Sequence, residues 1–523
     1  MEGKHGKGVS RGEIDNSQRI SFNEAPKKFK NMLLGILTLI PVIQLFTPLN
    51  NDIWFILKYG ETICAQGIPK TDLFSMHEGL DLVIQQWLSD IIYWKAYSLA
   101  GDVGIKIIVM LCNIYAGFVI FKLCMHISKN NFFISYLTSL ASSAMLLGFV
   151  FTSRPQSFTV CILVTELYFY EKYMTNSQWK YLIPIPLLSL LLINLHASMW
   201  FVQFILLLPF LVNCIKLDFR FIKSEGAKPF PLIASAILSF AVGFINPYGL
   251  KAITYVFTSY GVYEINDYIN EMKPLNIGSI DGIFSALLML VLILLNFKTK
   301  DGEVIDSKPR YLLLVLGFGF MMFSNFRNIM LFLSCAVFTT AYCLRNVNPK
   351  IKLEQKSQSK RKTVLLSILL IVALCLSVFL LTSDELGAFS DGEGGEKYKY
   401  TECEKSAQFV TESYPNASEL DIYTNYADGD YFEFHGMHPY IDPRAEVFLK
   451  ANNGKADIYI EYYNLQHGKI KADEFLNKYG FDLLVIDEDK DFLSIYLEDD
   501  DNYKVVYKDS YRTVYENERQ VNK

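Results

Sequence analysis

Residues 181–215 read YLIPIPLLSLLLINLHASMWFVQFILLLPFLVNCI, a run of 35 residues without a single Lys, Arg, Asp or Glu. A helix needs about 17 to 25 predominantly apolar residues to cross a hydrocarbon core roughly 30 Å thick. We therefore read this run as two membrane spans, at about 181–195 and 197–215, joined by a tight turn at Asn194-Leu195-His196. The stretch predicts a helical hairpin in a membrane.

Apolar runs of this kind recur along the chain and predict about eleven transmembrane helices in a mainly α polytopic membrane protein. They lie at about 32–49, 103–125, 132–151, 155–174, 181–195, 197–215, 231–250, 280–297, 311–325, 328–344 and 363–382. The composition agrees, with 51% hydrophobic and 15% aromatic residues. The net charge of −5 gives no electrostatic footprint for nucleic acid.

The distribution of Lys and Arg predicts the orientation. Alternate connecting segments, at 1–31, 126–131, 171–181, 216–230, 297–310 and 345–362, hold 25 of them, whereas the other connections up to residue 328 hold 7. Because basic loops stay in the cytoplasm, we expect the N-terminus inside and the C-terminus outside. The first apolar run lacks a small-x-small cleavage site, so it is expected to be an uncleaved anchor.

Three regions follow from these patterns. Residues 1–31 form a cytoplasmic tail, 32–382 the transmembrane domain with a long outer loop at 50–102, and 383–523 an extracytoplasmic α/β domain. In the last region, strand-like stretches at 420–423, 481–486, 503–507 and 511–515 alternate with helical ones. Only Cys64 and Cys403 are expected outside, and the sequence leaves open whether they pair.

Five polar motifs fall at the outer ends of different hairpins, so that they can converge on one candidate active site at the outer membrane interface. They are Asp52-Ile53-Trp54, Arg154-Pro155-Gln156, Asn194-Leu195-His196, Asn246-Pro247-Tyr248-Gly249 and Phe326-Arg327-Asn328. In the loop 50–102, two Trp-bearing helical stretches, around Trp54 and Trp87, have apolar faces suited to the membrane interface.

A carboxylate directly after the first span, followed by two interfacial helices, resembles the GT-C glycosyltransferases, and specifically the bacterial mannosyltransferase-like members of that superfamily. The similar motifs are Asp52-Ile53-Trp54, Gly60, Gly67-Ile68-Pro69, Thr71-Asp72, Phe74-Ser75, Gln86-Trp87-Leu88, Arg154-Pro155-Gln156, Asn194-Leu195-His196, Asn246-Pro247-Tyr248-Gly249, Glu271, Arg327-Asn328 and Tyr440-Ile441-Asp442-Pro443-Arg444. The chain departs from the family pattern at Gln85-Gln86, where a His-Glu pair is expected, and at Met272, where a Trp is expected.

The resemblance implies a GT-C-like arrangement of helices in a bacterial cytoplasmic membrane. It also implies an inverting glycosyltransferase that takes a sugar from a polyprenyl-phosphate carrier lipid and passes it to a glycan, protein or lipid acceptor outside the cytoplasm. Such chemistry needs a base near the acceptor hydroxyl and cationic or hydrogen-bonding groups near the phosphate. Two other function classes stay open. One is a non-catalytic relative that binds lipid or a partner, which is favoured by Gln86 at a position where a carboxylate is expected. The other is a transporter of lipid-linked glycans.

Asp52 is the candidate catalytic base, with capping of the helix that begins at Ile53 as the structural alternative. Arg154, His196 and Arg327 are the candidates for binding the carrier phosphate. For the two arginines the alternative is contact with ordinary lipid headgroups, and for His196 it is a structural hydrogen bond.

Six further residues are candidates for contacting the acceptor or lining the cavity: Asp72, Gln86, Trp87, Glu271, Asp442 and Arg444. Turn chemistry is the alternative for Asp442-Pro443. No cofactor is certain. A divalent metal is possible, because Asp52, Asp72, His77, Glu78 and Glu271 could supply ligands, but their spacing matches no defined metal-binding loop.

Overall fold

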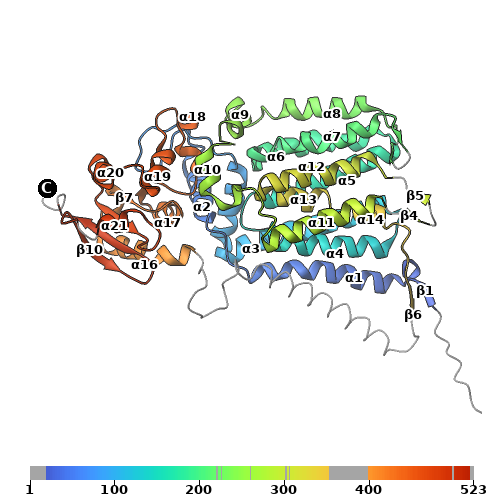
Figure 1. Cartoon of the computed structure of the whole chain (residues 1–523), viewed down its shortest axis with the longest axis horizontal. Coiled ribbons are helices and arrows are strands. Elements are labelled where there is room, and N and C mark those ends of the chain that lie inside the picture. The colour runs from blue at the N-terminus through green and yellow to red at the C-terminus, as the bar shows by residue number, and fades with distance from the viewer. Residues whose placement is uncertain are drawn as a thin grey trace, which may run out of the picture.

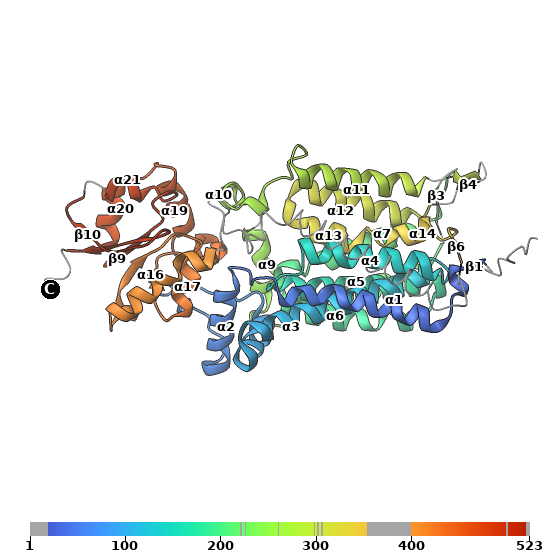
Figure 2. The same ribbon diagram turned by 90° about the horizontal axis from the view of Figure 1, so that it is seen from below.

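The computed structural model describes residues 19–352 and 399–518, apart from residues 220, 221, 225, 260, 298, 301, 302, 305, 306, 498 and 499. A bundle of helices forms one end of the molecule and an α/β unit forms the other (Figures 1 and 2). Short helices and the loop 50–102 lie between them, and the candidate site is found there.

The helices of the bundle run roughly parallel to one another (Figures 1 and 2). They are α1 (Lys27–Leu39) with η2 (Ile40–Leu45), α3 (Trp87–Ile127), α4 (Phe132–Phe149), α5 (Gln156–Asn176), α6 (Pro184–Leu195), α7 (Val202–Cys214), α8 (Pro229–Val242), α11 (Ile280–Asn296), α12 (Pro309–Ser324), α13 (Ile329–Cys335) and α14 (Thr339–Cys343). Large apolar side chains such as Phe230, Ile237, Leu287 and Leu294 are exposed on the outside of the bundle. A soluble surface rarely exposes so many, so this surface is suited to lipid.

Ten of the eleven expected spans coincide with helical segments, and the run at 363–382 lies outside the described residues. Within the described part, five helices are long and apolar enough to cross a membrane by length and composition, and four shorter apolar helices of 10–17 residues accompany them. The expected span 231–250 is too long, because α8 ends at Val242 and the chain turns at Asn246-Pro247 before the next helix, α9 (Leu250–Ser259).

The described residues of the segments expected in the cytoplasm gather at the end of the bundle opposite the α/β unit (Figures 1 and 2). Three short antiparallel pairs lie there: β1 (Arg19–Ser21) with β6 (Lys350–Lys352), β2 (Asp218–Phe219) with β3 (Ile222–Lys223), and β4 (Thr299–Lys300) with β5 (Glu303–Val304). The basic connections and the α/β unit are thus separated by the length of the bundle.

Residues 399–518 fold into a five-stranded sheet with helices packed against it. The strand order is β10 (Tyr503–Lys508), β11 (Thr513–Asn517), β9 (Leu483–Ile486), β7 (Asp421–Tyr423) and β8 (His438–Pro439). Strand β7 is parallel to both β8 and β9, whereas β9, β11 and β10 pair in antiparallel fashion. The helices are α16 (Lys399–Ser413), α17 (Gly429–Phe434), α18 (Lys450–Asn453), α19 (Ile458–Gln466), α20 (Ala472–Tyr479) and α21 (Leu493–Leu497).

The first helix of the loop 50–102 packs against the α/β unit. Helix α2 (Ile53–Gln66) buries Trp54, Ile56 and Leu57, and α17 of the α/β unit covers this apolar face. The ring of Trp54 lies 5.0 Å from that of Tyr431 and 5.1 Å from that of Phe434. The apolar face around Trp54, expected to lie in the membrane interface, thus has a protein partner in α17.

The second expected interfacial helix and the span that follows it are joined into one kinked helix, α3. The kink lies at Ala100 and Gly101, and Gly101 has a φ of 56°, a conformation that glycine tolerates best. Helix α2 packs along the first part of α3, with Gly60 so close to the backbone of Asp90 that a Cβ would lie 2.3 Å from its carbonyl oxygen. This packing fixes the position of Asp52 at the start of α2.

Candidate active site

A cavity of about 170 Å³ lies between the bundle and the α/β unit, and the segments that line it are far apart in the sequence. Its wall includes Asp52, Tyr59, Gln85, Gln86, Arg154, His196, Tyr255, Glu271, Met272, Arg327, Tyr426, Arg444 and Glu446. Four of the five outer-end motifs contribute a residue to it. The fifth does not, since Asn246 closes its own turn through hydrogen bonds to the carbonyls of Gly243 and Gly249.

Arg154 lies at the centre of the polar wall. Its Nη2 is 2.6 Å from Oδ2 of Asp52, its Nη1 donates to both carboxylate oxygens of Glu271 at 3.1 Å, and its Nε donates to Oδ1 of Asn50 at 2.8 Å. Two carboxylates therefore share one guanidinium. Arg154 is fully engaged by protein groups, which removes the alternative that it merely contacts lipid headgroups.

Asp52 does not cap helix α2. Its side chain makes no capping hydrogen bond, and of its two carboxylate oxygens only Oδ2 is engaged by a residue in the described part of the chain. Removal from bulk water raises the pKa of Asp52 above its ordinary value, against the opposing effect of the Arg154 charge. A carboxylate with a raised pKa and one unengaged oxygen can accept a proton from a ligand in the cavity.

Glu271 behaves differently from Asp52. The adjacent Arg154 holds the pKa of Glu271 below its ordinary value, and burial opposes this effect only in part. Glu271 comes from η5 (Asn270–Met272), directly after α10 (Tyr263–Tyr268). It is therefore ionised and suited to neutralising and orienting Arg154 rather than to exchanging protons.

Arg327 is the unpaired cation of the cavity. It lies in η6 (Phe326–Asn328) before α13, and within the described ranges its guanidinium has no ion pair or hydrogen bond. Its charge nevertheless acts on Asp52, Glu271 and His196, which places it close to the acidic centre. An unpaired guanidinium in a cavity is a ready ligand for phosphate oxygens.

His196 is neutral in this site. Burial, together with the charges of Arg327 and Arg154, lowers its pKa to about 3. Its Nδ1 is 2.8 Å from Oγ1 of Thr159 on α5. If the hydroxyl of Thr159 donates to Nδ1, the tautomer leaves an Nε2–H that can donate to a ligand oxygen. His196 can thus contribute a neutral hydrogen bond, not a positive charge.

Two wall residues had no signal in the sequence that assigned them to this site. Glu446 of η8 (Ala445–Phe448) has a pKa raised by burial, and Tyr426 follows strand β7. Glu446 lies two residues beyond the Asp442-Pro443-Arg444 motif, which was the nearest available signal. Both come from the α/β unit, so only the packing of that unit onto the bundle brings them to the cavity.

Three residues assigned from sequence to the acceptor or the cavity wall do not line the cavity: Asp72, Trp87 and Asp442. The indole Nε1 of Trp87 donates instead to Oδ1 of Asn194 at 2.9 Å. Asp72 and Asp442 are turned towards Arg444, which binds them at 2.7 Å and 2.5 Å. These two carboxylates belong to a buried ion cluster with Arg444, outside the cavity lining.

Arg444, Gln86 and Glu271 do line the cavity, as expected. Arg444 is also held by Glu433 at 2.5 Å and by the hydroxyl of Tyr59 at 2.8 Å. Three carboxylates surround this one guanidinium, and the cluster joins the loop 50–102 to the α/β unit. Arg444 thus presents a neutralised face to the cavity.

The carboxylates suggested for a metal do not converge. His77 is 2.9 Å from the backbone carbonyl of Tyr440, and Asp72 binds Arg444. Within residues 19–352 and 399–518, no group of three or more His, Cys, Asp or Glu is arranged to hold a metal ion. Asp52 and Glu271 do meet, but the guanidinium of Arg154 occupies the position between them. The donor set therefore does not fit a divalent cation there.

No protein-family model matches the chain, and no curated protein sequence matches it. Two solved structures align with 93% of its length, each with a TM-score of 0.49. One is the oligosaccharyltransferase of Archaeoglobus fulgidus in complex with Zn and sulfate, of which 73% is covered at 12% identity. The other is apo ArnT from Cupriavidus metallidurans, of which 97% is covered at 10% identity. Both of these proteins are GT-C superfamily membrane glycosyltransferases.

Proposed function

We propose that this protein is an inverting membrane glycosyltransferase that moves a sugar from a polyprenyl-phosphate carrier to an acceptor outside the cytoplasm. The observation that carries the proposal is the cavity at one end of an apolar bundle, which holds Asp52 with a free carboxylate oxygen and Arg327 without a partner. A lipid phosphate at the membrane surface can reach this end while its tail stays among the helices.

The reaction is a single displacement at the anomeric carbon. The acceptor oxygen forms a bond to that carbon, the bond to the carrier phosphate oxygen breaks, and the acceptor proton passes to Asp52. Negative charge grows on the departing phosphate, where Arg327 supplies the cation and His196 a neutral hydrogen bond. Arg154 holds Asp52 in place through Oδ2 and leaves the other oxygen for the acceptor, while Glu271 orients Arg154.

We further propose that the membrane is a bacterial cytoplasmic membrane, with the basic end of the bundle inside and the α/β unit outside. The transporter alternative is not supported by the position of the cavity. Transporter sites usually lie near the middle of the membrane, whereas this cavity lies at the end of the bundle, against the α/β unit.

Substitution of the base tests the proposal. Purified protein is given a polyprenyl-phosphate sugar and an extracted acceptor, and transfer is followed by mass analysis of the product. Asp52→Asn keeps size and hydrogen bonding but removes the base, so we expect the rate to fall about 10² to 10⁴-fold. The matched control is Asp81→Asn, an exposed carboxylate paired with Lys251 outside the cavity, which should retain the wild-type rate.

Full transfer by Asp52→Asn would remove Asp52 from the mechanism. In that case Glu446→Gln becomes the informative variant, because Glu446 is the remaining carboxylate of the cavity lining, and in the described residues the ion pairs of Arg154 are with Asp52 and Glu271. Absence of transfer by the wild type with every donor tried, while it still binds polyprenyl phosphate, would favour the non-catalytic relative instead.

A further inference from the structure

In the sheet of the α/β unit, the connections that leave two neighbouring parallel strands run to opposite sides. Strands β7 and β9 are parallel neighbours, with Ile422 opposite Leu483 and Tyr423 opposite Leu484. The chain leaves β7 towards β8 on one side, and it leaves β9 towards β11 and β10 on the other. In open α/β sheets a crevice forms at the carboxyl ends of two such strands, and ligands commonly bind in it.

A second cavity lies at this point. Asn425, Tyr426 and Ala427, which follow β7, and Asp487, Lys490 and Asp491, which follow β9, form opposite parts of its wall. Helix α19 adds Gln466, and Tyr268 of the bundle's outer loop closes one side. The cavity volume is about 110 Å³. Since one water needs about 10–15 Å³ of such space, there is room for roughly eight water-sized groups, about one sugar ring.

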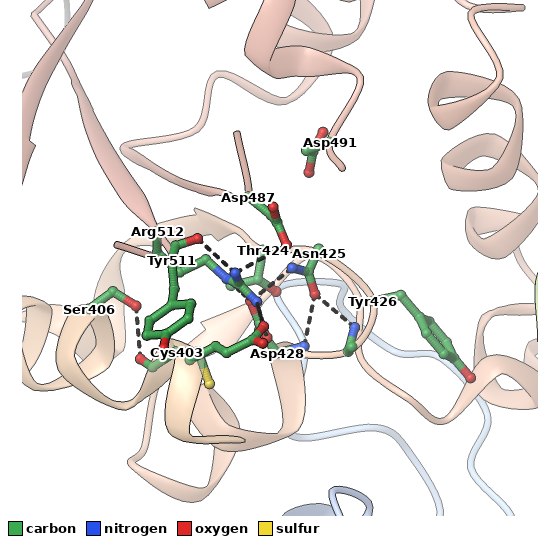
Figure 3. A network of polar contacts seen from close by, with 12 residues as sticks. Cys403, Ser406, Thr424, Asn425, Tyr426, Asp428, Asp487, Asp491, Tyr511 and Arg512 are labelled. Carbon is green, nitrogen blue, oxygen red and sulfur yellow. Dashed lines mark hydrogen bonds and ion pairs between the residues drawn. The ribbon is translucent and has the colours of Figure 1, made fainter. Parts of the chain in front are cut away.

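Positive charge in this wall is largely neutralised. Arg512 binds Asp428 at 2.6 Å, Asp487 at 3.1 Å and Glu402 at 3.2 Å, as Figure 3 shows for the first two of these partners. All of its guanidinium nitrogens are thereby engaged. Lys490 is the remaining cation of the wall, and it is exposed. An anionic ligand would have to approach several carboxylates, which disfavours phosphates and uronic acids.

The acceptors of the wall are held rigidly. Asp491 is 4% exposed, and it accepts hydrogen bonds from the hydroxyl of Tyr423 and from Nε2 of Gln466 at 3.1–3.3 Å. The backbone N–H of Leu493 also donates to it, at 3.1 Å. Its Oδ2 has only the Tyr423 hydroxyl as a partner in the described part of the chain, so it can accept one more donor. Fixed carboxylate and amide groups beside tyrosine rings suit a ligand with several hydroxyl donors and an apolar ring face.

We propose that this second cavity binds one neutral sugar ring. Tyr426 lines both cavities, so the two are neighbours. Figure 3 shows its ring pointing away from the Arg512 network. If the proposed function holds, the bound sugar is one residue of the acceptor glycan. The hydroxyl of the neighbouring glycan residue then lies at the first cavity. The binding itself does not depend on that function.

Binding is measured by saturation-transfer NMR on the full chain in lipid nanodiscs free of glycoside detergents. The probes are methyl α- and β-glycosides of glucose, galactose, mannose and N-acetylglucosamine, with glucose 6-phosphate as the anionic comparison. We expect at least one neutral glycoside to bind and glucose 6-phosphate to bind more weakly. Asp491→Asn removes a charged acceptor and should weaken the binding about tenfold.

A second variant guards against misfolding of the first. Ala427→Leu adds bulk to the wall of the cavity and replaces none of the side chains that bind Arg512, and it should also abolish the glycoside signal. Asp501→Asn, at an exposed aspartate of the same unit, is the matched control for Asp491→Asn and should leave the signal unchanged.

Three results would overturn the proposal: no neutral glycoside binds, binding is unaffected in both cavity variants, or glucose 6-phosphate binds more tightly than every neutral probe. Failure of the proposed function looks different. Transfer would then be absent in the wild type, while the glycoside signal and its loss in Ala427→Leu persist.

Discussion

Two arginines in the first cavity are in opposite situations. Arg154 is saturated by Asp52, Glu271 and Asn50, and it serves to hold the acidic centre in place. Arg327 has no partner among the described residues, so its charge is available to a ligand. An arginine left without a carboxylate in a half-enclosed site costs stability unless a ligand uses it, which is why we assign phosphate binding to Arg327 rather than to Arg154.

Arg327→Ala should weaken both donor binding and turnover, because a phosphate contact acts on the ground state and on the transition state. A hydrogen bond to a charged group contributes about 1.5–3 kcal/mol, which corresponds to a loss of roughly 10 to 150-fold in kcat/KM for the donor. Steady-state kinetics with varied polyprenyl-phosphate sugar measure this. Arg327→Lys should recover part of the activity, and a normal donor KM in the Ala variant would refute the assignment.

The pH dependence of transfer should report Asp52. A base works only when deprotonated, so kcat/KM is expected to be full above the pKa of Asp52 and to fall as the pH drops through it. Burial raises this pKa, which puts the acid limb above the value of about 3.9 for an ordinary aspartate. His196 has a pKa near 3 and adds no limb near neutrality. The limb should therefore persist in His196→Gln and vanish from the residual rate of Asp52→Asn.

Among the elements, the contact between the loop 50–102 and the α/β unit depends on the Arg444 cluster. Asp72 follows α2, Glu433 lies on α17, and Asp442 follows β8, so one guanidinium ties three separate elements together. All of these side chains are nearly inaccessible to solvent. Removing the cation leaves buried carboxylates without compensation, which is far more costly than the loss of an exposed ion pair.

Arg444→Met should therefore lower the free energy of unfolding by about 3–5 kcal/mol. The matched control is Lys251→Met, which breaks the exposed pair with Asp81 and should cost less than about 1 kcal/mol. Thermal unfolding in detergent, followed by tryptophan fluorescence, compares the two. A small effect in Arg444→Met would show that apolar packing alone, such as that of Trp54 on α17, holds the unit in place.

The sign of the pH effect is a further check on the same cluster. In the wild type, Arg444 holds the pKa of Asp72 low against the effect of burial, so the contribution of Asp72 is present above its unfolded pKa and is lost on acidification. Without Arg444, burial is left to raise the folded-state pKa of Asp72 above its unfolded value. The variant should then lose stability as the pH rises, most clearly between about pH 4 and 7. The lower end of this range is the ordinary carboxylate pKa of about 4.

At the scale of the whole molecule, the separation of the basic connections from the α/β unit predicts which groups an impermeant reagent reaches. Cys64 is exposed at the end that we propose to be outside. It should react with an impermeant maleimide in intact cells, and Cys64→Ser should remove the signal. Cys403 is buried and is not a suitable probe.

The complementary probe is Lys180→Cys in the Cys64→Ser background, since Lys180 is exposed at the basic end of the bundle. This cysteine should react only after the cells are opened. Labelling of Lys180→Cys from outside, with protection of Cys64, would reverse the orientation of the protein.

The sequence by itself determined the helical bundle, because length and apolar character are local properties that a hydrocarbon core selects directly. It also determined that Asp52, Arg154, His196 and Arg327 belong to one end, since hairpins fix which turns share a side. The strands at 421–423, 483–486 and 503–508 could also be predicted, because local runs of β-branched and aromatic residues favour strands.

Only the tertiary structure decided which polar side chains face the cavity and which face one another. Asp72 and Asp442 looked like site residues but pair with Arg444, whereas Glu446 and Tyr426 reach the cavity because the α/β unit docks on the bundle. Likewise, α17 and not the membrane covers Trp54. The physical reason is that a charge or an apolar face takes the partner that packing brings within a few ångströms, and residues from 50 to 450 along the chain meet only after folding.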